Sequence, residues 1–408
     1  MRITVCSHYF APEIGAPSAR IYDLAREWIA TGHRVQVVTC FPNHPHGTIY
    51  PPYRQSALLR ESIDGIDVVR LWTYVTPNKG IVKRTLGHLS FMLSAMLLPR
   101  RKSAPADVVI GTSPTLFAAV AAARMARRRG VPFVMEVRDL WPASFSELGV
   151  LRNRTLLRIL ERLELWLYRR AAGVVTVTEA FRQNLIARGV PAAKVCTIPN
   201  GADLSFWQPQ LGDPQRWRRQ LGIGDDRFVV LYIGAHGISQ RLSAVLRAAA
   251  RLRDDPSIVF VLVGEGAEKA MLMEEARRAS LDKVRFIDPT DKAGVRDFYA
   301  AAGACLVPLR DIPLFSTFIP SKMFEMMAMG RPIVASVRGE AAEILEHSQA
   351  AIVVPPEDDA AIAEAIVKIR GGEGPNGSAG RAFVEANYSR VQLAERYAAF
   401  LARTRGAP

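Results

Sequence analysis

Two glycine-containing segments of the chain combine residue types that suit the binding of an anion. The segment Glu13-Ile14-Gly15-Ala16-Pro17-Ser18 links an apolar run to a helical pattern, and Gly234-Ala235-His236-Gly237-Ile238-Ser239-Gln240 does the same in the second half. A helix N-terminus offers free N–H groups to an anion, and glycine permits close backbone approach. The alternative is that glycine merely suits such turns. The residues expected to hold a diphosphate are Gly15, Ala16, His236, Gly237 and Gln240.

A third candidate is the segment Ile319-Pro320-Ser321-Lys322-Met323-Phe324-Glu325, which opens a helical pattern ending at Gly330. A carboxylate at position 325 could accept both hydroxyl groups of a ribose, and the ammonium of Lys322 could meet a phosphate. The alternative is that Glu325 only complements the helix dipole, which favours acidic residues near a helix start.

Arg138 and Asp139 follow the apolar run that ends at Val137. Ligands of open parallel sheets bind beyond the carboxyl ends of the strands, so both side chains are expected at a binding site. At that position the two side chains could take a catalytic role. The alternative is a local ion pair without a catalytic role.

The histidines of the segment 41–47, His44 and His46, could suggest a metal ion, but no third ligand has suitable spacing. We therefore expect them in a loop beside an acceptor. The chain also has no Asp-x-Asp pair to present a divalent cation to a diphosphate, so no metal and no other cofactor is expected.

The net charge of +14 comes entirely from the first half of the chain. Residues 1–199 hold 27 Lys and Arg against 13 Asp and Glu, whereas residues 200–408 hold 26 of each. Such asymmetry indicates nucleic acid, an anionic membrane surface or a polyanionic substrate as partner. Nucleic acid is disfavoured, because no recognition motif is present and aromatic residues are not interleaved with the basic ones.

Basic residues also flank the apolar stretch from Leu86 to Leu98, which is far shorter than the roughly 20 residues that span a bilayer. An apolar helix bordered by cations suits partial insertion beside anionic lipid. A buried core helix with solvated ends explains the pattern equally well. The basic residues concerned are Lys83, Arg84, Arg100, Arg101 and Lys102.

The elements that must position these residues alternate between short Val/Ile-rich runs and helical patterns in both halves. Such alternation predicts an α/β fold with parallel sheets covered on both faces, and 408 residues favour two domains. The turn-rich segment 199–212 is the expected linker. The tail from Phe383 to Leu401 is expected to be helical. The predicted domains are residues 1–199, 200–386 and a tail helix, 387–408, that packs back on the first domain.

The N-terminus shows no targeting signal, because a strand-like run begins directly after Met1 and Arg2. The four cysteines lie far apart and show neither metal spacing nor a disulfide pattern. We therefore expect a cytoplasmic protein that associates peripherally with the inner face of the plasma membrane.

Several motifs together resemble the retaining glycosyltransferases of family 4, which have the GT-B fold of two facing Rossmann-like domains. The motifs are Phe10–Ala16, Gly32–Val35, Ile198–Asp203, Leu262–Gly266, Pro320–Pro332 and Asn387–Ser389. The segments Arg138–Pro142 and Pro320–Lys322 resemble the branch that makes surface polysaccharides, including N-acetyl-L-fucosamine transferases. The chain departs from the family at Thr317, where the first of two glutamates usually stands.

The resemblance implies a nucleotide-sugar donor between the two domains. Glu325 would hold the ribose, and the Gly15 and Gly237 loops would hold the diphosphate. Ile287 would lie near the base, with Glu265 and Ser321 in the donor motifs. Arg241 and Lys322 are the candidates for neutralising phosphate.

The implied reaction is retaining, metal-independent transfer of a sugar, with an N-acetylated amino sugar linked to UDP as the expected donor. The expected acceptor is a saccharide on a polyprenyl diphosphate, as in O-antigen synthesis. Two alternatives stay open. A nucleotide-sugar 2-epimerase of the same fold would form product without an acceptor, and a non-catalytic nucleotide- or membrane-binding module would leave the donor intact.

Overall fold

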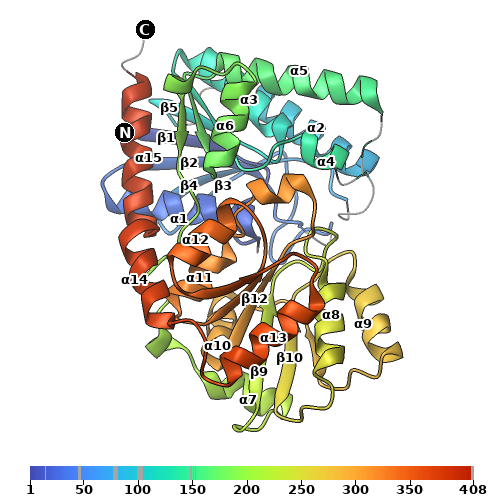
Figure 1. Cartoon of the computed structure of the whole chain (residues 1–408). Coiled ribbons are helices and arrows are strands. Elements are labelled where there is room, and N and C mark those ends of the chain that lie inside the picture. Colours follow the sequence, from blue (N-terminus) through green and yellow to red (C-terminus); the bar gives the residue numbers. More distant parts are fainter. Residues whose placement is uncertain are drawn as a thin grey trace. The chain divides into compact units, whose positions relative to one another are not determined.

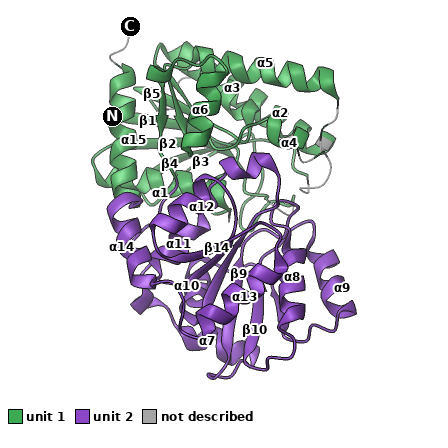
Figure 2. Ribbon diagram, viewed as in Figure 1, with its two compact units in different colours: residues 1–199, 390–408 green, residues 200–389 purple. Residues whose placement is uncertain are grey.

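The computed structural model describes residues 1–405 except 14, 45–46, 77–80, 99–103, 148, 150 and 152. The chain divides into two compact units, one of residues 1–199 and 390–408 and one of residues 200–389 (Figure 2). Both are α/β units built on largely parallel sheets, as the sequence predicts (Figure 1). None of the described helices is long and apolar enough to cross a membrane.

The described part of the first unit contains one eight-stranded sheet of order β3-β4-β2-β1-β5-β6-β7-β8. All neighbouring strands are parallel except β3 and β4, which form an antiparallel hairpin. The strands are β1 (Arg2–Cys6), β2 (Arg34–Cys40), β3 (Leu58–Ile63), β4 (Ile66–Leu71), β5 (Val108–Thr112), β6 (Phe133–Val137), β7 (Gly173–Thr176) and β8 (Val195–Thr197). The helices are α1 (Ala16–Ala30), α2 (Ile81–Leu97), α3 (Leu116–Arg129), α4 (Ala143–Glu147), α5 (Arg154–Arg170), α6 (Glu179–Ala187) and α15 (Arg390–Arg405).

Helices cover both faces of this sheet, and two glycines show how closely they pack. A Cβ atom on Gly111 of β5 would lie 2.7 Å from the Cβ of Ala122 in α3. On the other face, a Cβ on Gly173 of β7 would lie 2.6 Å from the ring of Phe400 in α15. Helix α15 shares a core with α1, in which the Trp28 indole N–H donates to the Ala394 carbonyl at 3.0 Å. The end of the chain is therefore part of the first unit.

The second unit is a six-stranded, wholly parallel sheet of order β11-β10-β9-β12-β13-β14 among the described residues. Its strands are β9 (Phe228–Ile233), β10 (Ile258–Val263), β11 (Val284–Ile287), β12 (Ala304–Pro308), β13 (Ile333–Ser336) and β14 (Ala351–Val354). Its helices are α7 (Pro214–Leu221), α8 (Leu242–Arg251), α9 (Lys269–Arg278), α10 (Lys292–Ala301), α11 (Lys322–Ala328), α12 (Glu340–His347), α13 (Asp359–Arg370) and α14 (Gly377–Asn387). Short 3₁₀ turns occur at Ala192–Lys194, Pro209–Leu211 and Pro313–Thr317.

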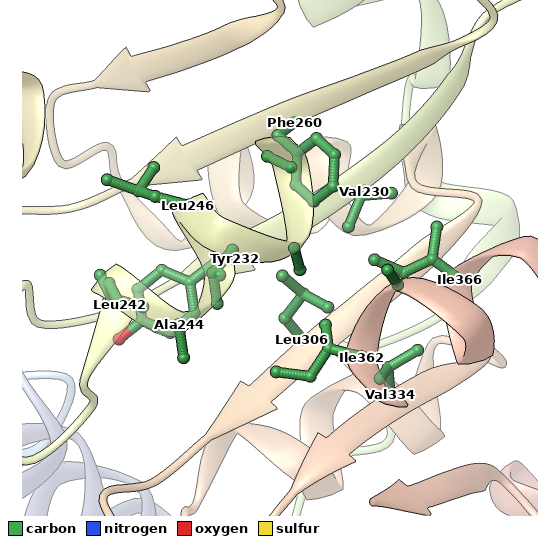
Figure 3. Packing of buried hydrophobic residues seen from close by; sticks show 14 of the residues in the cluster. Val230, Tyr232, Leu242, Ala244, Leu246, Phe260, Leu306, Val334, Ile362 and Ile366 are labelled. Carbon is green, nitrogen blue, oxygen red and sulfur yellow. The ribbon is translucent and has the colours of Figure 1, made fainter. Parts of the chain in front are cut away.

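The core of the second unit joins α8, α9 and α13 to one face of its sheet. Tyr232 and Phe260 from the strands pack with Leu242 and Leu246 of α8 and with Ile366 of α13 (Figure 3). The apolar stripe of the α8 sequence thus faces the sheet, as its periodicity predicts. This packing fixes the strand ends from which the loops of the unit emerge.

The tail from Phe383 to Leu401 is helical, as expected, except at Tyr388 and Ser389. Helix α14 ends at Asn387 and α15 begins at Arg390, so Tyr388 and Ser389 lie outside both helices. Ser389 forms a parallel bridge with Ala202, whose N–H donates to the Tyr388 carbonyl at 3.0 Å. This pairing needs an extended backbone, which interrupts the helix where the chain returns to the first unit.

Candidate functional site

The glycine segments of the second unit lock together at the carboxyl ends of β9 and β10. A Cβ atom on Gly264 would lie 1.9 Å from the Gly234 carbonyl oxygen, and one on Gly266 would lie 2.3 Å from the His236 carbonyl oxygen. The His236 N–H donates to the Glu265 carbonyl at 2.9 Å. Gly234 and Gly264 both have a φ of +148°, which L-residues rarely adopt. Only glycine lets the two backbones cross this closely.

His236 is completely buried in this crossing, and neither of its ring nitrogens has a hydrogen-bond partner among the described residues. Its ring lies near the rings of Tyr232 and Phe286, with centroids 5.9 and 6.1 Å away. Burial, reinforced by the positive charge of Lys269, lowers the pKa of His236 to about 4. The imidazole is therefore neutral at physiological pH.

Lys322 reaches from the start of α11 to the end of β9. Its ammonium donates to the Ile233 carbonyl at 2.6 Å and lies 4.0 Å from the centroid of the Tyr232 ring. A Cβ on Gly234 would be 2.3 Å from its Nζ, so the amine lies directly beneath the glycine turn. Burial lowers the pKa of Lys322 to about 7, although Glu325 opposes the shift. The charge of this amine therefore responds to whatever binds at the turn.

Glu325 stands one turn further along α11. Its Oε2 accepts a hydrogen bond from the hydroxyl group of Tyr299 at 3.1 Å. Tyr299 is fully buried, and burial and the nearby carboxylate raise its pKa well above the usual value. The phenol therefore remains a donor that fixes one carboxylate oxygen of Glu325.

The remaining predicted residues of the second unit also lie at this edge of the sheet. The Ile287 carbonyl accepts the Gly264 N–H at 2.9 Å, which joins the end of β11 to the glycine crossing. Glu265 pairs with Lys269 at 3.2 Å. Gln240 N–H donates to the Gly237 carbonyl at 3.1 Å, which closes the turn before α8. Ser321 is half-buried at the start of α11.

Arg241 forms an ion pair with Glu357 at 3.1 Å and is nearly half exposed. The other carboxylate oxygen of Glu357 accepts the Asp311 N–H at 3.0 Å. Arg241 therefore already has an anionic partner within the chain, which a phosphate would have to replace.

In the first unit, the structure brings Arg138 to the start of α1. Its guanidinium donates to the carbonyls of Ala16 at 2.7 Å and Pro17 at 2.9 Å, directly after Gly15. Burial lowers the pKa of Arg138 to about 10, against the influence of Glu136. The described hydrogen bonds of this side chain go to backbone carbonyls at the start of α1, so Arg138 holds the Gly15 segment in place.

Asp139 lies beside Arg138 and is anchored through two serines. The backbone N–H groups of Arg138 and Asp139 donate to the Ser113 hydroxyl at 2.8 and 3.2 Å. The Ser144 hydroxyl donates to the Asp139 carboxylate, whose pKa is raised by burial. The described contacts do not include an ion pair between Arg138 and Asp139, so they do not support the alternative of a local ion pair.

Two buried ion pairs that were not predicted from the sequence lie where the chain leaves the first unit and where it returns to it. Arg20 and Glu136 lie 3.0 Å apart and are only 2% and 3% exposed. The Arg20 guanidinium also donates to the carbonyls of Ile198 and Pro199, both at 2.8 Å. Arg390, the first residue of α15, pairs with Asp23 of α1 at 3.6 Å. No spacing rule reveals these pairs, because their members lie more than 100 residues apart.

The first unit also contains a small pocket, partly open to solvent, which we call the histidine pocket. Two of its residues, His8 and Tyr9, follow β1 directly, where ligands of open sheets bind. His8 and His88 meet edge to face with centroids 4.6 Å apart, and the Tyr9 hydroxyl lies 3.5 Å from the Nε2 of His88. The side chains that define the pocket are His8, Tyr9, His44, Tyr74, Thr76, Arg84 and His88.

Glu13 fixes the loop that bears His44. Its Oε1 accepts the N–H groups of Asn43 at 2.8 Å and His44 at 2.9 Å. Burial raises the pKa of Glu13 to about 7, although the two N–H groups favour its charged form. His46 lies outside the described residues.

Helix α2 has a buried face and an exposed apolar face. Phe91 and Ala95 are buried. A Cβ atom on Gly87 would lie 2.9 Å from the Tyr74 carbonyl oxygen, so the glycine lets the two segments pack closely. The opposite face carries an apolar stripe of Val82, Leu86, Leu93 and Leu97, which are 73%, 50%, 55% and 77% exposed. The alternative of a buried core helix with solvated ends is therefore wrong, because the exposed stripe runs through the middle of α2. Lys83 is exposed beside the stripe, whereas Arg100, Arg101 and Lys102 lie outside the described residues.

Comparison with known proteins follows the division of the chain. Residues 15–201 match the model of a glycosyl transferase 4-like domain, and residues 227–370 match that of the glycosyl transferases group 1. Together the two models cover about four-fifths of the chain. The chain belongs to the GT-B glycosyltransferases.

This glycosyltransferase is 27% identical over 376 residues to the putative colanic acid biosynthesis glycosyl transferase WcaI of Escherichia coli K12, covering 90% of this chain and 91% of the relative. It is 29% identical to a D-inositol 3-phosphate glycosyltransferase of Kribbella flavida, over 48% of this chain and 47% of that one.

Two solved structures share its fold over nearly their whole length. Sucrose-phosphate synthase from Thermosynechococcus elongatus has a TM-score of 0.77 and 19% identity, covering 98% of both chains. Anabaena HepE in complex with UDP-glucose has a TM-score of 0.74 and 18% identity, covering 99% of this chain and 100% of HepE. At these identities the likeness shows the fold alone.

Proposed function

We propose that this glycosyltransferase moves a sugar from a UDP-sugar to a lipid-linked saccharide during surface polysaccharide synthesis, with retention of anomeric configuration. The donor sugar is an N-acetylated amino sugar such as N-acetyl-L-fucosamine. The observation that carries the proposal is the crossing of Gly234 and Gly264 above Lys322, with Glu325 one turn away. The resemblance to the surface-polysaccharide branch and the name of the Escherichia coli relative support the class of product.

Donor binding follows from the chemistry of the second unit. Backbone N–H groups of the glycine crossing meet the diphosphate, and Lys322 beneath the turn gains charge as the anion approaches. Glu325, with one oxygen fixed by Tyr299, accepts the ribose hydroxyls. The base lies near Ile287, at the end of β11.

Stabilising the departing diphosphate is the main chemical demand of such a transfer. In this proposal the backbone N–H groups and Lys322 meet that demand without a metal ion. Arg138 acts as a positioning residue that holds the Gly15 segment, and Asp139 orients the acceptor.

The acceptor side of the proposal rests on the first unit. Helix α2 presents its apolar stripe beside Lys83, which is the pattern of a helix lying on an anionic membrane. Helix α5 has a second group of exposed apolar side chains, Leu156, Ile159 and Trp166. We place the enzyme at the inner face of the plasma membrane, where a polyprenyl-diphosphate-linked saccharide is available.

An acceptor-dependence assay tests the function. The full chain is incubated with UDP-N-acetylhexosamines, with and without an extract of lipid-linked saccharides, and UDP release and product anomer are measured. The proposal is supported if UDP release depends on the extract and the product has the same anomeric configuration as the donor. Sugar conversion without extract indicates the epimerase, and intact donor in both samples indicates a binding module; either result contradicts it.

A further inference from the structure

The histidine pocket is lined by several side chains that can form hydrogen bonds and by one arginine, Arg84. The Tyr9 hydroxyl, the Arg84 guanidinium and the Thr76 hydroxyl line it together with three imidazoles. His8 is 7% exposed, and in the part of the chain that the structure describes its Nδ1 has no hydrogen-bond partner, which is costly for a buried polar atom. A built pocket with an unsatisfied buried nitrogen in its wall indicates a ligand that supplies hydrogen-bonding atoms.

The charges around the pocket specify the sign of that ligand. Burial and the neighbouring His88 and His44 lower the pKa of His8 well below its usual value, and burial and Arg84 lower that of His88 to about 4. One oxygen of the nearby Glu13 carboxylate, Oε1, accepts two backbone N–H groups of the 43–44 loop. Both histidines are therefore neutral at physiological pH and offer hydrogen bonds rather than charge, and Arg84 is the cationic residue of the lining, which favours an anion.

The shape of α2 restricts where such an anion comes from. Arg84, Gly87 and His88 face the pocket, whereas the apolar stripe lies on the opposite side of the same helix. An α-helix is about 10 Å across. If the stripe rests on a bilayer, the pocket lies roughly one helix diameter above it, within reach of a diphosphate head group. Tyr74 lines the pocket and is 43% exposed, so an aromatic ring stands at the rim.

We propose that the histidine pocket of the first unit binds a diphosphate, with Arg84, Tyr9 and His88 as its ligands. The proposal deepens the proposed function, because a lipid-linked acceptor carries this group. The diphosphate of the donor belongs to the separate glycine crossing of the second unit.

Calorimetry on the full chain tests this site. Inorganic diphosphate and farnesyl diphosphate are each titrated in the presence of saturating UDP, which occupies the donor site. Loss of a charged donor to a phosphate weakens binding by about tenfold or more, so Arg84→Gln should do so. Tyr9→Phe removes one hydroxyl group and should weaken binding by about three- to tenfold. Arg124→Gln is the matched control, because it removes one exposed arginine of α3 that does not line the pocket.

The two titrants separate the sources of the anion. Tighter binding of farnesyl diphosphate indicates a lipid-borne group that also contacts the rim, and equal binding indicates a free anion; both support the pocket. No binding of either titrant, or an equal loss in Arg84→Gln and Arg124→Gln, overturns the proposal. Because UDP binding is measured separately, failure of the donor site is distinguished from failure of the pocket.

Discussion

At the scale of single residues, burial shifts the pKa values of candidate site residues in both units. Lys322 lies under a glycine turn with its ammonium on a backbone carbonyl, and burial lowers its pKa to about 7. A free amine in water would keep its charge to much higher pH. The folded protein therefore holds a lysine that is largely neutral above pH 7 until an anion arrives.

We predict that UDP binding at pH 8 takes up protons. Below about pH 7 Lys322 is already charged, so uptake vanishes there; above it, the bound diphosphate raises the pKa of the amine and draws in a proton. Calorimetry in buffers of different ionisation enthalpy measures the uptake. Lys322→Met should abolish it, and identical uptake in this variant would exclude Lys322 as the phosphate partner.

The buried pair of Arg20 and Glu136 makes a second prediction. Removing one partner of a buried pair leaves an uncompensated charge, so Glu136→Gln should lower the free energy of unfolding by about 3–5 kcal/mol. Glu179, which is 48% exposed and pairs with Arg182, is the control, and Glu179→Gln should cost at most about 1 kcal/mol. Chemical denaturation compares the two variants, and similar losses would show that the buried pair does not stabilise the first unit.

At the scale of elements, the donor loops depend on close backbone crossing. Gly264→Ala would place a Cβ 1.9 Å from the Gly234 carbonyl oxygen, so the two loops must separate. We predict that UDP binding falls below detection in this variant. Gly372 is the matched control: its φ is also positive, at +86°, but a Cβ there meets nothing within 4 Å. Gly372→Ala should cost only about 1 kcal/mol of stability and leave UDP binding unchanged. Equal UDP binding in the two variants would contradict the assignment of the loops.

The exposed stripe of α2 predicts membrane binding. Each leucine that enters the bilayer interface contributes about 1.5–3 kcal/mol, so Leu86→Glu should reduce binding to anionic vesicles by about tenfold or more. Met271 of α9 is similarly exposed, at 52%, in the other unit, and Met271→Glu serves as the control. Sedimentation with vesicles measures the bound fraction. Unchanged sedimentation of Leu86→Glu would show that the stripe does not contact lipid.

Elements with strong patterns could be read from the sequence, and those that depend on partners could not. The apolar runs Phe228–Ile233 and Ile258–Val263 stand out in the sequence, and they are β9 and β10. Strand β3 was missed because its sequence, LLRESI, is half polar, as suits an edge strand that pairs on one side. The break at Tyr388 was missed because it is caused by pairing with Ala202, far away in the sequence.

At the scale of the whole molecule, the sequence predicted two α/β units, and the structure and the family models agree on them. Gly237 and Lys322 were expected at a binding site from the residue types around them, whereas Glu265 was assigned only through the family resemblance. The sequence did not reveal that Arg138 donates to the carbonyls of Ala16 and Pro17, because a backbone carbonyl accepts hydrogen bonds whatever the residue type. The histidine pocket was missed for a similar reason, because His8 and His88 meet only in the fold.

The central claim is that the second unit binds UDP through Glu325, and a calorimetric panel of UDP, GDP, ADP, dTDP and CMP tests it most directly. We predict selective binding of UDP, unaffected by EDTA and weakened by about tenfold or more in Glu325→Ala, which loses its hydrogen bonds to the ribose. Glu364→Ala, which removes an exposed carboxylate of α13, should bind UDP like the wild type. Absence of nucleotide binding, or equal UDP binding by Glu325→Ala and Glu364→Ala, would contradict the placement of the donor site.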